Sequence, residues 1–519
     1  MIRSFLTVST GTLASRLLGF VRDSMIAALL GAGPVADSFL VAFQLVNVVR
    51  RLLSEGALNA ALVPAWLRVR DADGPAAAAA FAGRVLGTVS AALIAAALLI
   101  GVLMPFVITA LAPGFAGQAT LTSAVDDARL MLPYLAFAGP VTVMMALLNA
   151  QGYFTLTAFS PLLFNIALIG VMVALLGWPQ DGATATLVIA ATVGIAGLLQ
   201  LLILVLRRGD GTATPLRVAF DGEMRGFFAK AVPGMIASAG PQLLIVAAAI
   251  IASSSPSAVS WLYFANRLIE LPLGIVGVAM GTVLVPELTR ALRDNDKASM
   301  AHAESRGLEL AVGLALPATL GLIALDEPIV RLLFEHGLFS AADTEGTARA
   351  LIWLALGLPA HVLVKALSPA FFAREDTATP LWATLKGIAV AIAAALVLGR
   401  LFGASGIAAA IALGAWSNAL SLIRRGAATF GFAIDPAARR RLPRIVLSAL
   451  LMGGVLWLTA RFALPPSETI HGLAQAAALL ALIAGGIAFY GLLLAFLGVT
   501  GWRETLNAVR RPSRSDLRA

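Results

Sequence analysis

The sequence lacks cysteine entirely and carries little charge. The absence of cysteine from its 519 residues excludes disulfides, iron–sulfur clusters and thiolate zinc sites. Its four histidines are too far apart in the sequence to form a metal-ligand motif, so no metal site or other cofactor is predicted. Charged residues make up only 13% of the chain, about half the share in an average soluble domain. A soluble fold of this length would need more polar surface. A nucleotide-binding loop, a metalloprotease motif and a nucleophile–base pair are also missing, so an enzyme is not predicted.

What the sequence has instead is long apolar runs. Hydrophobic residues make up 59% of the chain, and the mean hydropathy is +0.90. A membrane-spanning helix needs about 20 mostly apolar residues, and fourteen such runs occur without the alternation of a barrel strand. They cover approximately residues 5–31, 36–64, 82–111, 128–151, 157–177, 184–206, 227–252, 258–286, 307–325, 345–373, 379–402, 404–423, 444–463 and 471–498. The first run is long and contains charged residues, so it is not read as a cleavable signal peptide. The sequence predicts an all-α membrane protein.

The distribution of basic residues predicts the orientation. Formal net charge is +9, and the sequence pI is near 10.7. Arginine and lysine gather after the second, sixth, eighth and twelfth runs and in the C-terminal tail, whereas the odd-numbered connections are nearly bare. Basic residues concentrate on the cytoplasmic side of a membrane, so both termini are expected in the cytoplasm. The high pI then reflects topology, and no nucleic-acid partner is predicted.

Two stretches of the sequence resemble later ones. Residues 38–68 align without gaps on 260–290, and 135–162 align on 354–381, with shared prolines at nearly constant spacing. We interpret this as two six-helix lobes in parallel orientation, an arrangement found in alternating-access transporters that hold substrate between the repeats. The expected parts are an N-terminal lobe (1–225), a C-terminal lobe (226–425) and a C-terminal helix pair with a basic tail (426–519).

Charged residues occur inside the apolar runs. Each cation at mid-membrane costs roughly 2.5–3.5 kcal/mol, so seven facing lipid would cost on the order of 20 kcal/mol. The seven are Arg16, Arg22, Arg50, Arg51, Arg267, Lys365 and Lys386, accompanied by the acids Asp23, Glu55 and Glu270. Helical spacing places several of them on polar faces: Asp37, Asn47 and Glu55 in the second run, and Ser260, Arg267 and Glu270 in the eighth. These faces predict a central cavity with excess positive charge.

Such a cavity suits an anionic ligand, because arginine pairs with two phosphate oxygens at once. Structural alternatives remain open for some residues. Arg51 and Lys386 could extend to the membrane interface, Arg267 and Glu270 could form a structural pair, and His361 fits packing better than proton transfer. For Arg16, Arg22 and Arg267 we favour ligand binding, because we expect them to lack neutralising partners.

Particular segments resemble a known family. SRLLGFVRD (15–23), GAGPVADSFLVAF (31–43), NVVRRLLSEGALNAALVP (47–64), SWLYFANRLIELPLGIVGVAMGTVLVP (260–286) and REDTATP (374–380) closely resemble the MurJ/MviN family of lipid II flippases. This family belongs to the multidrug/oligosaccharidyl-lipid/polysaccharide exporter superfamily. The resemblance implies fourteen helices in two lobes plus a C-terminal pair that frames a groove for the lipid tail. It also implies transport of undecaprenyl-diphosphate-disaccharide-pentapeptide across the bacterial inner membrane for peptidoglycan synthesis, by a chain that acts as a monomer.

The resemblance also implies which residues bind substrate. Four cavity arginines correspond to Arg16, Arg22, Arg50 and Arg267, with Asp23 as an ion-pair partner. Further polar positions of the cavity correspond to Ser15, Asp37, Asn47, Glu55, Ser260, Glu270 and Lys365. Helical phase places Arg51 rather than Arg50 on the polar face, but the resemblance favours Arg50, and we predict Arg50.

The sequence departs from the family pattern in places. Gln44, Val46 and Asn266 stand where lysine, proline and aspartate are common, so the cavity charge differs somewhat. Runs 227–252, 379–402 and 404–423 contain no acid, which disfavours sodium coupling. Two alternatives stay open: a flippase for another polyprenyl-diphosphate-linked glycan, and a cation-coupled drug antiporter of the same superfamily. The excess of cations disfavours the antiporter.

Overall fold

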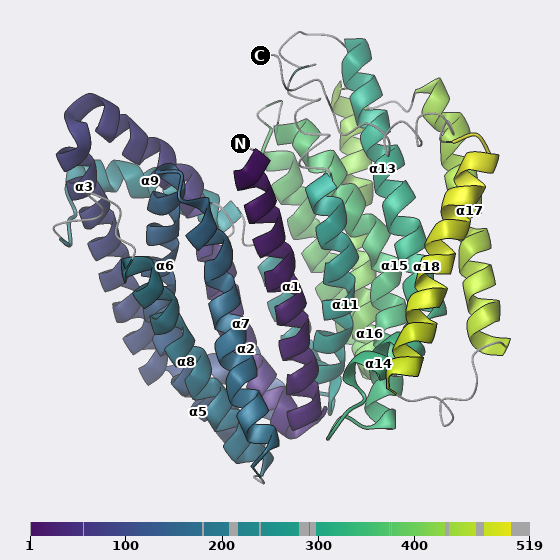
Figure 1. Ribbon diagram of the computed structural model, residues 1–519, viewed down its shortest axis with the longest axis horizontal. Helices are drawn as coiled ribbons and strands as arrows, with labels where there is room; N and C mark the ends of the chain where they lie inside the picture. The colour runs from purple at the N-terminus through teal and green to yellow at the C-terminus, as the bar shows by residue number, and fades with distance from the viewer. Residues whose placement is uncertain are drawn as a thin grey trace. The chain divides into compact units, whose positions relative to one another are not determined.

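The structure is a computed structural model. It describes residues 2–54, 57–178, 181–206, 216–237, 240–279, 290, 297–372, 374, 376–430, 435–462 and 472–499. The described residues form helices and their connections, with no strand among them (Figure 1). Nine helical stretches in these ranges are long and apolar enough to cross a membrane. The all-helical fold is therefore confirmed, and the count of fourteen spans stays a prediction.

The residues group into two compact units. Unit 1 comprises Met1–Phe264 and Phe334–Asp343, and unit 2 comprises Ala265–Leu333 and Thr344–Ala519. Residues 226–264 thus pack within unit 1, whereas the internal repeat assigns them to the second lobe. The repeat concerns sequence similarity and the units concern contacts, so the lobe boundaries stay a prediction.

Unit 1 contains most of the helices. They are α1 (Ile2–Leu30), α2 (Pro34–Ser54), α3 (Ala57–Val102), α4 (Met104–Leu111), the 3₁₀ turn η1 (Pro113–Phe115), α5 (Ala119–Met131), α6 (Pro133–Ala150), α7 (Phe154–Leu176), α8 (Gly182–Leu206), α9 (Gly222–Ala237), α10 (Gly240–Ala252) and the first part of α11 (Ala258–Ala279). Within this unit α1 packs along α7, α3 packs along α6 and α9, and α8 packs against α5, α6 and α7. One buried apolar cluster joins Leu62 and Phe81 of α3 to Leu147 of α6 and Phe227 of α9.

Unit 2 is built on longer helices. They are the rest of α11, α13 (Lys297–Ala324), α14 (Asp326–Phe334), α15 (Ala341–Phe372), α16 (Ala378–Phe430), α17 (Pro436–Phe462) and α18 (Leu473–Phe496), of which α14 and α15 each place a terminus in unit 1. Helix α17 packs against both α13 and α18. The Tyr490 hydroxyl of α18 donates a hydrogen bond to the Gly313 carbonyl of α13 (2.9 Å).

Several expected spans differ in detail from the helices observed. The expected loop around residues 65–81 is helical and belongs to α3, with a break at Gly74 (φ 86°, ψ 177°). The expected connection 112–127 is helical from residue 119, and the fourth span is two helices that meet at Pro133. The eleventh and twelfth spans form α16, interrupted at Gly403 (φ 57°). At both breaks a glycine with positive φ changes the direction of the chain, and hydropathy alone does not reveal this backbone conformation.

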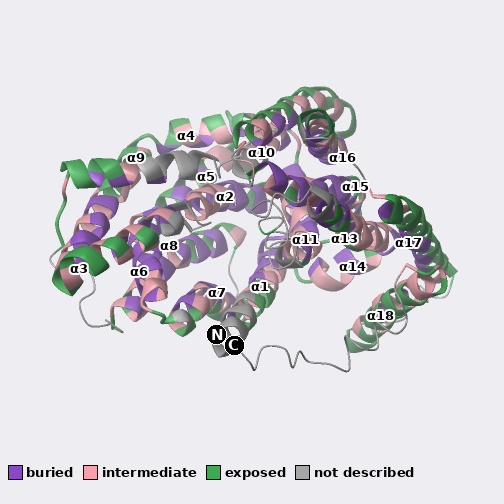
Figure 2. Cartoon of the chain, turned by 90° about the horizontal axis from the view of Figure 1, so that it is seen from above, coloured by how far each residue is buried: buried purple, intermediate pink, exposed green. Residues whose placement is uncertain are grey.

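Apolar side chains cover much of the outer surface. On α18, Leu480, Ile487 and Phe496 are exposed, whereas Leu479 and Gly486 are buried. Figure 2 shows the same contrast along α17 and α18, where exposed positions predominate. Exposed apolar side chains in such number along a helix are unfavourable in water. They fit contact with lipid and support a multi-pass membrane protein.

Aspartates begin several helices outside the apolar spans. The backbone N–H groups of Thr184, Thr379 and Ala438 donate to Asp181, Asp376 and Asp435, respectively. These are N-cap bonds, which satisfy helix donors that have no partner within the helix. The hydrogen bonds from the capped turns hold the pKa of each of these carboxyl groups below its ordinary value.

A strap of extended chain, residues 216–221, lies against α3 and leads into α9. Arg217 N donates to the Gly83 carbonyl (3.3 Å), and Ala219 N donates to Thr88 Oγ1 (3.1 Å). Gly87 allows this approach, because a Cβ at that position would lie 2.5 Å from the Arg217 carbonyl oxygen.

The strap ends in a charged anchor. Arg84 of α3 forms salt bridges with Asp221, at the end of the strap, and with Glu223, in the first turn of α9. Asp221 also accepts a hydrogen bond from Met224 N (2.9 Å) and so caps α9. Close backbone packing and the anchor together hold α9 against α3.

Replacing Gly87 with alanine should weaken unit 1. The added Cβ meets backbone atoms of the strap, which cannot rotate away, and overpacking of this kind costs about 1–3 kcal/mol. The apparent melting temperature of the purified protein in detergent should fall. Gly170→Ala is the matched control, because no described atom lies within 4 Å of its added Cβ and alanine favours a helix over glycine. Equal melting temperatures for the two variants would show that the strap is not tightly packed.

Candidate functional site

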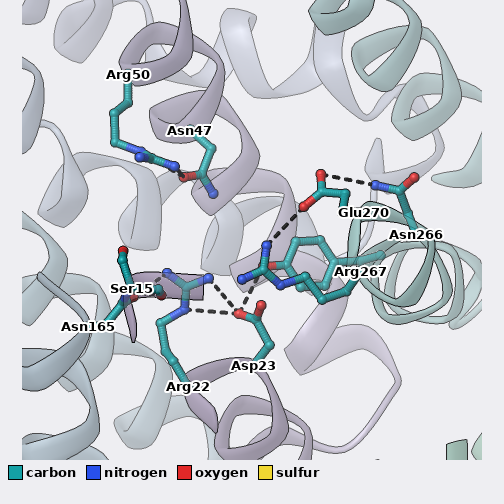
Figure 3. A network of polar contacts seen from close by, with 10 residues as sticks. Ser15, Arg22, Asp23, Asn47, Arg50, Asn165, Asn266, Arg267 and Glu270 are labelled. Atoms are coloured by element: carbon teal, nitrogen blue, oxygen red, sulfur yellow. Dashed lines mark hydrogen bonds and ion pairs between the residues drawn. The ribbon is translucent and has the colours of Figure 1, made fainter. Parts of the chain in front are cut away.

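A buried ion pair lies in the C-terminal half of α1. Arg22 Nε and Nη2 donate to Asp23 Oδ1 at 2.9 and 2.6 Å (Figure 3). The two residues are only 7% and 0% exposed. Removing a charge from water costs free energy, so charges buried this deeply need well-placed partners that offset this cost. Neighbours in sequence do not normally face one another on a helix, so groups from other helices must fix this arrangement.

Two other helices, α7 and α11, supply those groups. Arg22 Nη1 donates to Asn165 Oδ1 of α7 (3.0 Å), and Asn165 Nδ2 donates to the Ser15 carbonyl of α1 (3.1 Å). The Tyr263 hydroxyl of α11, within the part of that helix that belongs to unit 1, donates to Asp23 Oδ1 (3.2 Å). Asn165 thus ties two turns of α1 to α7, and Arg22 is bonded on both sides.

Aromatic rings enclose the same guanidinium. Arg22 Cζ lies 5.1 Å from the ring centre of Phe43 and 5.8 Å from that of Phe164. Cation–π contacts of this kind add roughly 0.5–2 kcal/mol, more when the cation is desolvated. Arg22 is therefore held in one orientation by a carboxylate, an amide and two rings.

The expectation that Arg22 and Arg267 lack neutralising partners is wrong. Arg22 pairs with Asp23, and Arg267 Nη1 donates to Glu270 Oε2 (2.9 Å) one turn along α11. Glu270 also accepts a longer bond from Asn266 Nδ2 (3.5 Å). Both members of the Arg267–Glu270 pair remain partly exposed, whereas the Arg22–Asp23 pair is sealed.

Arg16 differs from both. Its side chain is exposed, and it has no hydrogen-bond or ion-pair partner in the described part of the chain. Arg50 of α2 is half-buried and donates to Asn47 Oδ1 through Nε and Nη2 (3.4 and 3.3 Å). Arg50 and Asn47 thus lie on the same side of α2. That Arg50 rather than Arg51 faces the cavity stays a prediction.

Asp37 and Ser260 bond to each other. Asp37 Oδ1 accepts hydrogen bonds from Ser260 N (2.9 Å) and from the Ser260 hydroxyl, and Oδ2 accepts one from Ser257 N (3.1 Å). Asp37 and Ser260 are almost completely buried. Ser257 has a positive φ (59°) and lies in the turn directly before the start of α11. Asp37 therefore caps α11 from α2, and its carboxylate is already occupied by backbone donors.

The remaining predicted residues lie elsewhere. In unit 2, Lys365 of α15 brings Nζ close to Gly277 of α11, where an added Cβ would lie 3.3 Å from it. Gly277, which has no side chain, leaves room for the lysine. Glu55 lies outside the described residues. That arginines of both lobes share one chamber stays a prediction.

Sequence reasoning missed several members of the cluster. Asn165 is an isolated polar residue in an apolar run, which the sequence shows, but the sequence does not show that it bonds to Arg22. Phe43 and Phe164 have no feature that distinguishes them from core residues. Among the described residues, no group of three or more histidines and acids could hold a metal ion.

Comparison with known proteins gives consistent results. A family model described as "Lipid II flippase MurJ" matches residues 26–471. A "Probable lipid II flippase MurJ" of Rhizobium meliloti (strain 1021) is 38% identical over 520 residues, which is 98% of this chain and 96% of that protein. A "Lipid II flippase MurJ" of Burkholderia cenocepacia is 33% identical over 477 residues, covering 89% of this chain and 91% of its own length.

Solved structures share the fold. One described as "Lipid II flippase MurJ, inward closed conformation" matches with a TM-score of 0.79 and 22% identity, over 96% of this chain and 100% of that chain. An inward-facing multidrug resistance MATE family transporter of the MOP superfamily matches with a TM-score of 0.66 and 15% identity, over 85% and 98%. At these identities the likeness shows the arrangement of helices and nothing further.

Removing one member of the buried pair should destabilise the protein strongly. Asp23→Ala leaves the Arg22 cation buried without its carboxylate, which typically costs about 3–5 kcal/mol. Thermal unfolding in detergent should show a large drop in melting temperature for Asp23→Ala. The drop should be smaller for the double variant Arg22→Leu/Asp23→Leu, which removes both charges. Arg16→Gln is the control and should unfold like the wild type, since its side chain is exposed. An Asp23→Ala variant as stable as the wild type would mean that the pair is solvated.

Proposed function

The chain belongs to the MurJ family of lipid II flippases, and we propose that its exposed arginines hold the diphosphate of that lipid while its buried arginine positions the helices. Its function is to flip lipid II, the lipid-linked peptidoglycan precursor, and it is a transporter in the bacterial inner membrane. The observation that carries the proposal is the contrast between two arginines of α1. Arg16 is exposed and has no protein partner within the described residues, whereas Arg22 is 7% exposed and fully engaged.

Arg16 is suited to bind an anion that arrives from outside the protein. A guanidinium forms two parallel hydrogen bonds to phosphate, and such charge-assisted bonds are the strong ones. Binding at Arg16 breaks no existing ion pair. At Arg22 the same ligand would have to displace Asp23 and Asn165 and disturb the contact of α1 with α7.

Arg50 and Arg267 form an intermediate group in the proposal. Each has a nearby partner, Asn47 or Glu270, yet remains partly exposed. Asn47 is neutral, so its hydrogen bond does not offset the charge of the Arg50 guanidinium. Arg267 must exchange Glu270 for phosphate, and the released carboxylate would then repel the anion. Such an exchange makes binding at Arg267 weaker and easier to reverse, which transport requires.

The remaining polar residues complete the proposed set. Ser15, Asp23, Asp37 and Ser260 act as positioning residues, because their described bonds are to the protein itself. Lys365 adds positive charge on α15, and Glu55 adds a polar group on the stretch after α2. In this proposal the head group of the substrate contacts polar residues while its polyprenyl tail stays in lipid.

The driving force in this proposal is electrical. Bound diphosphate reduces repulsion among the cations and allows the two lobes to exchange an inward-open for an outward-open arrangement. A membrane potential that is negative inside favours outward movement of negative charge by about 2.3 kcal/mol per charge per 100 mV. Transport then needs no ATP. The absence of acids from runs 227–252, 379–402 and 404–423 supports a mechanism without sodium coupling.

Arg16→Ala should abolish or strongly impair flipping without unfolding the protein. Loss of a charge-assisted bond costs about 1.5–3 kcal/mol, or roughly 10- to 100-fold in apparent affinity for lipid II. The test is rescue of cells depleted of their own flippase, scored by lysis and by build-up of lipid II in the inner leaflet. Arg16→Lys should rescue partly, since it keeps the charge and loses the two-point geometry.

Arg349→Ala is the matched control for this experiment. Arg349 is an exposed arginine of α15 that pairs with Glu345 one turn away, and surface pairs of this kind contribute little. It should rescue fully at equal membrane abundance. Full rescue by Arg16→Ala as well would remove Arg16 from the binding site. Failure of both variants would point to expression rather than binding.

The proposed topology has a direct chemical test, because the natural chain has no cysteine. Thr122 and Asp71 are exposed residues of α5 and α3, in stretches assigned to the periplasmic and cytoplasmic sides. A membrane-impermeant maleimide should label Thr122→Cys in intact spheroplasts and Asp71→Cys only after permeabilisation. The reverse pattern would invert the orientation and place both termini in the periplasm.

A further inference from the structure

A second buried acid lies apart from the arginines. Asp127 of α5 is 0% exposed, and it is buried against α2 and α8. Its Oδ2 lies 3.5 Å from the Ser38 hydroxyl oxygen of α2, and the hydroxyl of Thr186 of α8 borders the same carboxyl group. Oδ1 has no hydrogen-bond partner among the described residues. No described cation forms a salt bridge with it.

The two hydroxyl groups are at best weak donors to it, since each also has a backbone acceptor and the Ser38 contact is long (3.5 Å). A hydroxyl has one proton and two lone pairs. The Ser38 hydroxyl donates its proton to the Val35 carbonyl at 2.8 Å, and the Thr186 hydroxyl donates to the Ala183 carbonyl at 2.8 Å. The shorter bonds to the backbone carbonyls are the stronger ones, and with the protons placed there each hydroxyl turns lone pairs toward Asp127. An ionised carboxylate, which only accepts, would face acceptors on both sides.

We infer that Asp127 is a proton-binding site, neutral in the folded protein, whose acidic proton sits on Oδ2 and is donated to Ser38 Oγ. A neutral acid supplies the donor that this arrangement lacks. It also leaves Oδ1 as a carbonyl oxygen, and an unpaired carbonyl is tolerated in a protein interior far better than an unpaired carboxylate oxygen. This inference does not depend on which substrate the protein carries.

The charges around Asp127 agree with a neutral acid. On α5 itself, Asp126 and Arg129 are both exposed. Of the elements packed against α5, α4, α8 and η1 carry no charged residue, and the titratable groups of α6 are limited to the phenol of Tyr134. Helix α2 carries Asp37 at the same end and Arg50 and Arg51 near its other end. The nearest of these groups along α2 is an acid, which opposes a second negative charge.

Loss of the proton should be felt at the start of α2. Ser38 lies next to Asp37, the residue that caps α11. A charged Asp127 would need water or a cation between α5 and α2, and this would move the turn that carries both residues. In the proposed topology this end of α2 meets the periplasm, so the proton exchanges with that side. Asp127 thereby links external pH to the position of the α11 cap.

Infrared spectroscopy of the purified full chain in lipid vesicles tests the inference. A protonated carboxyl group has a C=O stretching band that a carboxylate lacks. We expect such a band at neutral pH in the wild type, its loss in Asp127→Asn, and its persistence in the matched control Asp126→Asn, whose carboxyl group is exposed. Asp127→Asn keeps a donor for Ser38, so it should fold.

A second variant keeps the test decisive if Asp127→Asn is poorly folded. Ser38→Ala retains Asp127 and removes its acceptor, so the same band should move to higher frequency. The melting temperature of the wild type should also fall as the pH is raised from about 4 toward neutral, because the folded protein then holds a proton that the unfolded chain has already lost, and that of Asp127→Asn should not. The inference fails if the wild-type spectrum lacks the band, or if neither Asp127→Asn nor Ser38→Ala alters it.

Discussion

The structure depends on the pairing of charge inside an apolar medium. Where lipid replaces water, each ionised group must find its partner within the protein. The Arg22–Asp23 pair meets this condition with bonds to α7 and α11 and with two aromatic rings. Because the same groups hold α1 against α7, the pair fixes the position of α1, the helix that also carries Arg16.

This constraint separates the polar residues into two kinds. Residues whose polar atoms are satisfied by the protein, such as Asp37 on the α11 cap, define where helices begin and how they pack. Residues that remain exposed are available to a ligand that brings its own negative charge. A flippase for a diphosphate lipid needs both kinds. A site made only of free cations would repel itself, and one made only of sealed pairs would bind nothing.

The fold class followed from the sequence because hydropathy reports burial in lipid directly. Helix breaks followed less well: Gly74 and Gly403 interrupt helices through backbone conformation, and residues 119–127 are polar yet helical. Periodicity identified the polar faces that carry Asp37, Asn47 and Ser260, since a face is a local property. It did not identify partners. The contacts of Arg22 with Asn165, and of Asp37 with Ser260, join residues more than a hundred positions apart and arise only from packing.

The central claim is that Arg16 recognises the diphosphate while Arg22 serves the fold. The most direct measurement compares the affinity of purified protein for lipid II with that for the same lipid carrying a single phosphate, in the wild type and in Arg16→Ala. The wild type should prefer the diphosphate, and Arg16→Ala should lose most of this preference while remaining folded. An undiminished preference in Arg16→Ala would contradict the central claim.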